Sequence, residues 1–423
     1  MQEKSKDNKM QESASLFVKL DEIVEIVPKM PKISSDTEVS FLGMVDISTE
    51  GTIINTHRCT YSNLSKGYSK FLEGDILVAI ISPCFENGKG ALATGLINGI
   101  GLGSGQFHVL RATEKIDPYI LLNITLNKTF RKKGKLEMVG TTGRKMVPSS
   151  FIRNYQIFLP PLSEQQKIAS ILRTWDRAIE RTKRLIEIRQ KYLILLTRLL
   201  VYGYLRVDNK KTTSRIKYKW CSAPSDWSFF LIKDIAVGRS EFNVNNNDYT
   251  VLSCSKHYGF VRSLDFFKKQ IFSKKLTNYK IIYRNDFGFP SNHIEEGSIG
   301  LQNLEDKAVV SPIYTIFTPD NKYIYHDFLF RLLKTKTYIH IFCVLTTSSV
   351  DRRGKLSWTD FSNIGLCLPD LIEQKKISEI LVKQENLINN LSLYKKALQN
   401  QKQGLMQKLL TGQWRVRVEE DKI

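Results

Sequence analysis

Residues 160–207, PPLSEQQKIASILRTWDRAIERTKRLIEIRQKYLILLTRLLVYGYLRV, decide how this chain is organised, because their pattern returns 209 residues later. Identical residues open both copies without a gap, as Pro160, Leu162, Glu164, Gln165, Lys167, Ile168, Ile171 and Leu172 and as Pro369, Leu371, Glu373, Gln374, Lys376, Ile377, Ile380 and Leu381. The ends also agree, with Gly203, Arg206 and Val207 returning as Gly412, Arg415 and Val416. An internal repeat of this kind predicts a duplicated architecture.

Each copy predicts one long helix with its own start and stop signals. Ser163 with Gln166, and Asp370 with Glu373, have the spacing of a capping box at a helix start. Gly203 and Gly412 are typical helix stops. About 40 residues lie between these signals, which corresponds to roughly 60 Å of helix at 1.5 Å per residue.

Apolar residues in both helices recur alternately four and three positions apart, as in the seam of a coiled coil. The residues expected to pair the helices are Ile168, Leu172, Trp175, Ile179, Leu193, Leu196, Leu200, Ile377, Leu381, Ile388, Leu391, Leu398, Leu405 and Leu409. Polar residues interrupt the seam at different places, Thr182 and Arg189 in the first copy and Gln384, Lys395 and Lys402 in the second. Self-pairing would bury like charges against each other, so pairing of the first helix with the second is favoured. Two amphipathic helices that each pack on their own domain are the alternative.

The helices separate two stretches of domain size. Residues 1–15 are predicted to be disordered, 208–223 to form a linker and 417–423 a tail. Residues 16–159 (domain 1) and 224–368 (domain 2) show short β-rich runs followed by one helical stretch, which predicts two mixed α+β domains. Their landmarks correspond in order: FVKLDEIV with FLIKDIAV, EGDILVA with RNDFGFP, and DPYILLNITLNKT with HDFLFRLLKTKTY. The predicted order is therefore domain, helix 160–207, domain, helix 369–416.

Composition points to a polyanionic partner. The chain of 423 residues has 63 Lys and Arg against 42 Asp and Glu, a net charge of +21. Such an excess favours nucleic acid, although scattered surface lysine that serves solubility is the alternative. The six cysteines occur singly, so neither a zinc site nor a disulfide framework is expected and reduced cysteines are predicted. No stretch has the roughly 18 apolar residues of a membrane span, and a cytoplasmic location is expected.

Motifs that would indicate catalysis are missing. The alternating glycines of GIGLGSG (99–105) do not match a nucleotide-binding loop and favour a bent strand or turn. The acidic residues near Asp370 are explained by helix capping, which removes the support for a nuclease site. SPCF (82–85) lacks the amide or carboxylate of an amino-methyltransferase motif, and the six histidines show no ligand spacing. We therefore predict no catalytic residue, no metal site and no cofactor in this chain.

Basic loops beside a scaffold are typical of a nucleic-acid reader, in which lysine and arginine contact phosphates and base edges. The loops at 144–145 and 352–355 occupy equivalent places before the last strand of each domain, which raises them above other charged loops. For each single residue, a solvated surface charge is the alternative. The candidate DNA contacts are Arg131, Lys132, Lys133, Arg144, Lys145, Lys268, Lys269, Lys274, Lys275, Arg352, Arg353 and Lys355.

The repeated openings LPPLSEQQKI (159–168) and LPDLIEQKKI (368–377), between two unlike domains, resemble the specificity subunit of type I restriction-modification systems. The resemblance covers nearly the whole chain, although Asp370 replaces the second proline of the first copy. It implies two target-recognition domains held by an antiparallel coiled coil with pseudo-twofold symmetry. Each domain would read one half of a bipartite double-stranded DNA target.

The same resemblance implies partners. Two methyltransferase subunits would methylate adenine with S-adenosylmethionine, and restriction subunits would translocate DNA with ATP and Mg²⁺, so these cofactors are expected only in the partners. A recognition module of another defence system, an orphan DNA-binding protein and an interaction scaffold without DNA stay as alternatives. A stand-alone enzyme is disfavoured by the missing catalytic motifs.

Overall fold

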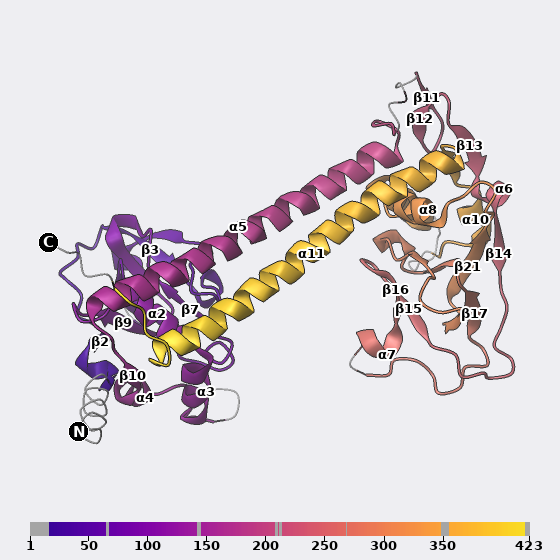
Figure 1. Ribbon diagram of the computed structural model, residues 1–423. Helices are drawn as coiled ribbons and strands as arrows, with labels where there is room; N and C mark the ends of the chain where they lie inside the picture. The colour runs from indigo at the N-terminus through magenta and orange to yellow at the C-terminus, as the bar shows by residue number, and fades with distance from the viewer. Residues whose placement is uncertain are drawn as a thin grey trace, which may run out of the picture. The chain divides into compact units, whose positions relative to one another are not determined.

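The structure is a computed structural model that describes residues 17–64, 67–141, 145–207, 210, 214–267, 269–347 and 355–418. The chain divides into two compact units, and each long helix begins in one unit and ends in the other. Unit 1 comprises residues 1–183 and 393–423, and unit 2 comprises residues 184–392. Each unit therefore contains one domain, part of the first long helix and part of the second (Figure 1).

Domain 1 is built on two four-stranded sheets, ordered β2-β9-β6-β7 and β4-β3-β8-β5, with β1 and β10 paired separately. Its strands are β1 Phe17–Lys19, β2 Val24–Ile26, β3 Glu38–Leu42, β4 His57–Thr60, β5 Ser69–Leu72, β6 Ile76–Ala79, β7 Gly90–Leu92, β8 Ile100–Gly103, β9 Phe107–Ala112 and β10 Gln156–Phe158. Its α-helices are α2 Pro118–Leu126, α3 Lys128–Leu136 and α4 Ser149–Asn154. The single helix expected from DPYILLNITLNKT is thus two helices, because the Asn127 side chain accepts from the Thr129 N–H and starts a new one.

Domain 2 repeats this plan. The sheet β14-β21-β18-β19 matches the first sheet of domain 1, and the pair β13–β22 matches β1–β10. The antiparallel pairs β15–β16 and β17–β20 are joined by a parallel bridge between Val251 and Val309, which matches the parallel pairing of β3 with β8. The strands are β13 Ser228–Leu231, β14 Ala236–Arg239, β15 Leu252–Ser255, β16 Gly259–Arg262, β17 Lys280–Tyr283, β18 Phe287–Pro290, β19 Gly300–Leu301, β20 Lys307–Val310, β21 Tyr314–Pro319 and β22 Gly365–Leu368. The α-helices are α6 Ile232–Ile235, α7 Ser263–Phe266, α8 His326–Leu333, α9 Lys336–Thr347 and α10 Trp358–Ser362.

One repeated landmark is a turn held by an aspartate. The Asp75 carboxylate accepts from the Leu72 N–H at 2.8 Å, and the Asp286 carboxylate accepts from the Tyr283 N–H at 2.9 Å. Both aspartates are buried immediately before an equivalent strand, β6 or β18. The correspondence of EGDILVA with RNDFGFP therefore reflects one turn used twice.

The long helices are α5, Leu162–Val201, and α11, Leu371–Leu410, each of 40 residues. Both end as expected, with Gly203 at φ 66° and Gly412 at φ 74°, a left-handed conformation that favours glycine. Asp370 caps α11 by accepting from the Glu373 N–H at 2.7 Å, which holds the pKa of Asp370 below its ordinary value. The expected cap at Ser163 is wrong, because α5 begins one residue earlier and Ser163 lies inside its first turn.

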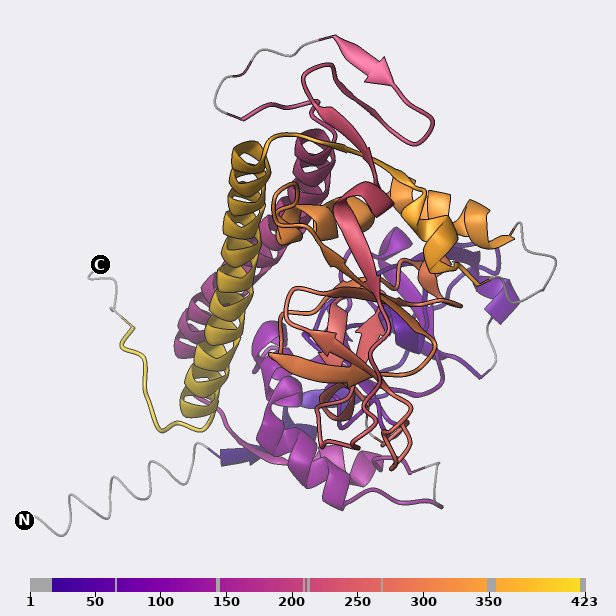
Figure 2. The ribbon, with the colours of Figure 1, turned by 90° about the vertical axis from the view of Figure 1, so that its right-hand side faces the viewer.

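The two helices run antiparallel in each unit and lie side by side there (Figures 1 and 2). In unit 1 the core of domain 1 joins Ile168 and Leu172 of α5 to Met406 and Leu409 of α11. In unit 2 the core of domain 2 joins the end of α5 to the start of α11, through Leu196, Leu200, Val201, Ile377 and Leu381. These contacts confirm the predicted fold class of two α+β domains, each followed by a long helix that pairs with the other.

Burial follows the expected seam. Of the predicted pairing residues, ten are buried, namely Ile168, Leu172, Ile179, Leu196, Leu200, Ile377, Leu381, Ile388, Leu398 and Leu409. Trp175, Leu193, Leu391 and Leu405 are half-buried. The seam lysine Lys402 donates to Asp176 at 2.6 Å in unit 1, and this ion pair explains how a charge is accommodated there.

A glutamate at the start of each long helix binds an arginine just beyond the end of the other. In unit 1, Arg415 donates to both carboxylate oxygens of Glu164, at 2.8 to 3.1 Å. In unit 2, Arg206 binds Glu373 in the same way, at 2.9 and 3.0 Å, and also binds Asp226. The second pair is more buried, since the Arg206 side chain is 1% exposed and that of Arg415 is 50% exposed. Hydrogen bonds to Glu373 and then to Asp226 raise the pKa of Arg206.

The glutamine next to each glutamate ties the helix start to its own domain. The Gln165 amide donates to the carbonyls of Lys115 and Pro160 and accepts from the Asp117 N–H, all at 2.9 Å. Gln374 makes the same three bonds in unit 2, with the carbonyls of Tyr323 and Pro369 and the Tyr325 N–H. In each copy, the glutamate therefore binds the arginine that follows the other long helix, and the glutamine binds the domain that precedes its own helix.

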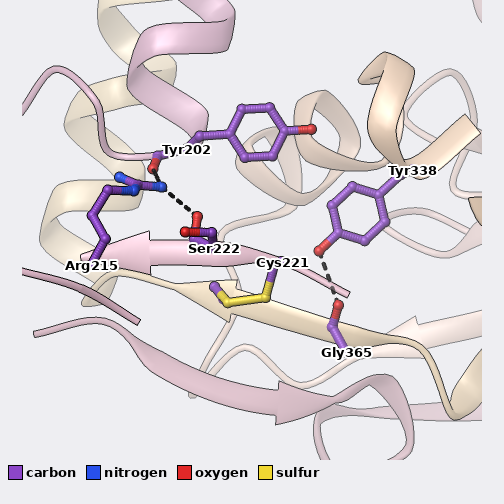
Figure 3. Close-up of a disulfide and its surroundings, with 7 residues drawn as sticks. Tyr202, Arg215, Cys221, Ser222, Tyr338 and Gly365 are labelled. Carbon is purple, nitrogen blue, oxygen red and sulfur yellow. Dashed lines mark hydrogen bonds between the residues drawn. A yellow bond between two sulfur atoms is a disulfide. The ribbon is translucent and has the colours of Figure 1, made fainter. Parts of the chain in front are cut away.

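The expectation of reduced cysteines without a disulfide is wrong for one pair. Cys221 and Cys367 form a disulfide in unit 2, across 146 residues of sequence (Figure 3). Cys221 lies in the turn of a hairpin formed by β11, Arg215–Lys217, and β12, Ser222–Pro224, and this turn belongs to the segment expected to be a linker. The Arg215 guanidinium donates to the carbonyls of Tyr202 and Ser222 and so joins this hairpin to the end of α5. Spacing alone did not reveal the pair, because the fold brings the two cysteines together.

Within the described part of the chain, no helix is both long enough and apolar enough to cross a membrane.

Candidate nucleic-acid interface

The basic loop of domain 1 follows α3 and is flanked by an antiparallel bridge between Val139 and Met146. Val139 and Met146 exchange two backbone hydrogen bonds of 2.9 Å, and residues 142–144 between them lie outside the described residues. The Val147 N–H then donates to the Ile80 carbonyl at 3.0 Å, immediately after strand β6. Lys145 is exposed at the base of this loop, and Arg144 lies outside the described residues.

The basic loop of domain 2 ends at the position that corresponds to the end of the loop in domain 1. The Leu356 N–H donates to the Ser291 carbonyl at 3.0 Å, and Ser291 immediately follows β18, the counterpart of β6. Lys355 is exposed just before this contact, whereas Arg352 and Arg353 lie outside the described residues. The two loops that the sequence paired thus end on equivalent strands, although the arginines themselves are not described.

The other candidate lysines that the structure describes are at the surface. Lys132 and Lys133 are exposed on α3, and the Lys133 ammonium lies 5.6 Å from the centre of the Tyr155 ring. Lys269, Lys274 and Lys275 are exposed on the segment between α7 and β17, while Lys268 lies outside the described residues. None of these described lysines, nor Lys145 or Lys355, forms an ion pair with a carboxylate in the part of the chain that the structure covers. Each can therefore face a phosphate without first giving up an internal ion pair.

Arg131 is buried inside domain 1, where DNA does not reach it. The residue is 5% exposed, and its guanidinium donates to the carbonyls of Thr125, Phe85 and Lys89. It also lies 4.6 Å from the centre of the Phe85 ring, and burial lowers the pKa of Arg131 to about 9. The helical spacing that exposes Lys132 and Lys133 turns Arg131 toward the core, so the sequence prediction for this residue is corrected.

Arg131→Ala is therefore expected to act on stability. The change should lower the free energy of unfolding by about 2 kcal/mol, because it removes the Arg131 donor from the buried Thr125 carbonyl and leaves space where the buried guanidinium packed. Urea unfolding of the full chain, followed by circular dichroism, measures this loss. Lys132→Ala, one residue away and exposed, is the matched control and should leave the unfolding midpoint unchanged. Equal midpoints for Arg131→Ala and wild type would contradict the structural role.

One group of described side chains has a metal-like arrangement that sequence spacing did not indicate. Potential ligand atoms of His293, Glu295 and Glu296 lie within 4.8 Å of one another, on the short turn that contains η5, Ile294–Glu296. The three are near neighbours in sequence, and His293 and Glu296 are exposed. Exposed acidic clusters of this kind are common on surfaces without a metal, so we assign no metal to it.

The partners of the repeated charges were not predicted from the sequence. Glu164, Arg206, Glu373 and Arg415 recur in the two copies and served only as markers of the repeat. Repetition of an acidic residue at each helix start and a basic residue after each helix end was the available signal. It would have suggested that the start of one copy meets the end of the other.

Comparison with known proteins places these features in a family context. The model of the type I restriction modification DNA specificity domain matches residues 13–190 and 211–400. The chain is 41% identical over 154 residues to the type I restriction enzyme EcoAI specificity subunit of Escherichia coli, which is 35% of this chain and 26% of that relative. It is 26% identical over 319 residues to the MjaVIII specificity subunit of Methanocaldococcus jannaschii, covering 71% of each chain. The chain thus spans about a quarter of the Escherichia coli relative.

Two solved structures share the fold. One, from a study of the assembly and conformational transition of a type I R-M system, has a TM-score of 0.60 at 17% identity, covering 94% of this chain and 98% of that chain. The other is the HsdS subunit of Thermoanaerobacter tengcongensis, with a TM-score of 0.54 at 16% identity, covering 94% of this chain and 97% of that one. At this level of identity the likeness supports the architecture and leaves the target sequence open.

Proposed function

Because the family model covers most of the chain in two copies, the chain belongs to the type I restriction modification DNA specificity family, and we propose that it reads a bipartite DNA target. Domain 1 would read one half-site and domain 2 the other. The observation that carries this proposal is the repeated plan of the two domains. In each domain, the residue that follows the basic loop bonds to the residue just after an equivalent strand, β6 or β18. The net charge of +21 supports a polyanionic partner.

Catalysis is assigned to partner proteins. We propose that two methyltransferase subunits and restriction subunits assemble with this chain in the cytoplasm, and that this chain itself is not an enzyme. S-adenosylmethionine, ATP and Mg²⁺ would then act only in those subunits. We also propose that the two target-recognition domains comprise residues 16–159 and 224–368 and that the long helices hold them.

A methylation map tests the proposal as a whole. Single-molecule sequencing of DNA from cells with the gene intact and with the gene deleted would be compared, in a strain that expresses the methyltransferase. A bipartite adenine-methylated motif that disappears on deletion is the expected result. Identical maps in the two strains would argue against the proposal and favour a DNA-binding protein without a methyltransferase partner.

Exchange of one domain tests whether reading is modular. Replacing residues 1–159 by the same segment of a family member with a known target should change one half of the methylated motif and leave the other half intact. The reason is that each domain has its own core and its own basic loop. A change in both halves would contradict independent reading, and the reciprocal exchange of residues 224–368 is the control.

The loop arginines provide a finer test. Arg144→Ala or Arg353→Ala should weaken specific binding by about 1–3 kcal/mol if the side chain contacts a base edge. Fluorescence anisotropy with the specific duplex and with a scrambled duplex, at several salt concentrations, distinguishes the two kinds of contact. Equal weakening on both duplexes with a shallower salt dependence would assign the arginine to a phosphate instead.

A further inference from the structure

A turn rich in asparagine follows strand β14 in domain 2. It comprises residues 243–247, Asn-Val-Asn-Asn-Asn, and we call it the Asn turn. The Asn246 N–H donates to the Asn243 carbonyl at 2.8 Å, so Val244 and Asn245 occupy the two central positions of a β-turn. Val244 is 72% exposed, and Asn245 is also exposed. The Asn turn therefore presents an apolar side chain and an amide, from consecutive residues, at the surface.

The neighbouring asparagines hold the backbone of this turn. Asn243 is 1% exposed, and its side chain donates to the Asn247 carbonyl at 2.9 Å and accepts from the Asn247 N–H at 3.0 Å. Asn246 has φ 50°, a left-handed conformation that asparagine adopts more readily than most residues, and its side chain accepts from the Leu276 N–H at 2.8 Å. Within the described residues, the Asn245 side chain forms no hydrogen bond. Asn245 therefore keeps both groups of its amide for a partner outside the chain.

Backbone pairing places the Asn turn beyond the same end of the sheet as the basic loop of domain 2. Arg239, at the end of β14, pairs with Ile316, near the start of β21. The start of β21 in turn pairs with the end of β18. Ser291, the residue after β18, accepts the bond at which the basic loop ends. The Asn turn begins four residues after Arg239, so both segments extend from one end of this sheet.

Basic residues border the Asn turn. Lys274 and Lys275 are exposed and directly precede Leu276, whose N–H bonds to the turn. Neither lysine forms an ion pair with a carboxylate in the part of the chain that the structure covers. The acidic residues on either side, Glu241 and Asp248, lie outside the turn itself. Lysines of this kind position a protein on phosphates, while neighbouring amides are suited to base edges.

The equivalent segment of domain 1 is different. It connects β2 to β3 as residues 27–37, VPKMPKISSDT, and contains no asparagine. Unlike segments at one position of a repeated fold are expected where the two domains bind different half-sites. The Asn turn is therefore explained by what domain 2 binds, since the shared fold forms without it in domain 1.

We propose that Asn245 contacts the adenine of an adenine–thymine pair in the half-site of domain 2, and that Val244 contacts the methyl group of a thymine beside it. In the major groove an asparagine amide can donate to N7 of adenine and accept from its N6 amino group, a pattern that distinguishes adenine from the other bases. An apolar side chain suits the thymine methyl group, which lies in the same groove. This inference rests on the proposed reading of a bipartite target and adds the residue and the base.

The test uses the full chain and duplexes that carry the motif found by methylation mapping. The half-site of domain 2 is the half that changes when residues 224–368 are exchanged. Each adenine in it is replaced in turn by 7-deazaadenine, which keeps the base pair but lacks the N7 acceptor, and each thymine by uracil, which lacks the methyl group. Fluorescence anisotropy should show one 7-deazaadenine position that weakens wild-type binding at least about tenfold, as expected for loss of a bidentate base contact.

Matched variants assign the contact to its side chain. Asn245→Ala should weaken binding to the unmodified duplex at least about tenfold and should no longer respond to 7-deazaadenine at the sensitive position. Val244→Ala should lose the response to uracil at one thymine. Asn321→Ala makes the same change at an exposed asparagine beyond the other end of β21, and it should bind like wild type. All three positions are exposed, so circular dichroism spectra should stay unchanged.

Three results would overturn the proposal. One is a response to 7-deazaadenine that Asn245→Ala retains at every position. Another is equal weakening of specific and scrambled duplexes by Asn245→Ala, which would assign Asn245 to the DNA backbone. The third is binding by Asn245→Ala that equals wild type, which would leave Asn245 as a solvated surface amide. Wild-type preference for the specific duplex over the scrambled one is measured in the same series, so failure of this proposal is distinguishable from failure of target reading.

Discussion

Replacing Arg206 by alanine is expected to lower the free energy of unfolding by about 3–5 kcal/mol, because the change leaves a buried carboxylate without its partner. The Glu373 side chain is 2% exposed, and the Arg206 guanidinium donates one hydrogen bond to each of its two carboxylate oxygens. Lys210, at 3.1 Å from Glu373, is too exposed to replace a bidentate arginine. Urea unfolding followed by tryptophan fluorescence reports the loss, since Trp227 is buried beside Arg206.

The equivalent pair in unit 1 is the control. Arg415 is half-exposed, so Arg415→Ala should cost only about 1 kcal/mol, as for an ion pair near the surface. Although burial opposes it, hydrogen bonds from Arg415 and the Val416 N–H hold the pKa of Glu164 below its ordinary 4.5. This contribution is therefore complete above pH 4.5 and is lost as pH falls through the lowered pKa. It should be smaller in Arg415→Ala, in which only the Val416 N–H still donates to Glu164. Equal losses in the two variants at pH 7 would contradict the role of burial.

Reduction of the Cys221–Cys367 bond is expected to lower the free energy of unfolding by about 2–4 kcal/mol, because the bond closes a long loop in the unfolded chain. The two cysteines are 146 residues apart, and the bond joins the hairpin β11–β12 to strand β22, which leads directly into α11. Urea midpoints of oxidised protein would be compared with and without a phosphine reductant. The cytoplasmic location that we propose is a reducing environment, so the oxidised form should be prepared in vitro.

The double variant Cys221→Ser/Cys367→Ser separates the bond from other effects of the reductant. Its midpoint should match that of the reduced wild type and should not respond to reductant. Cys59, Cys84, Cys254 and Cys343, which are not disulfide-bonded, are unchanged in this variant and control for unrelated oxidation. Identical midpoints for oxidised and reduced wild type, or a digest in which both thiols are free after oxidation, would contradict the prediction.

The sequence by itself determined the duplicated plan of this protein. Seam spacing, the Asp370 cap and the stops at Gly203 and Gly412 are local signals, because periodicity and capping act within a few residues of the chain. The correspondence of EGDILVA with RNDFGFP predicted matching elements for a similar reason, since the turn aspartate bonds three residues away. These features lead to two domains and two helices without knowledge of any long-range contact.

Only the tertiary structure decided which distant residues meet. The partners Arg206 with Glu373 and Cys221 with Cys367 are 167 and 146 residues apart, and no local pattern encodes such a pairing. The same holds for Arg131, since three consecutive basic residues read alike in sequence while the packing of α3 buries one of them. Contacts of this kind depend on which surfaces pack together, and the free energy of that packing belongs to the folded chain as a whole.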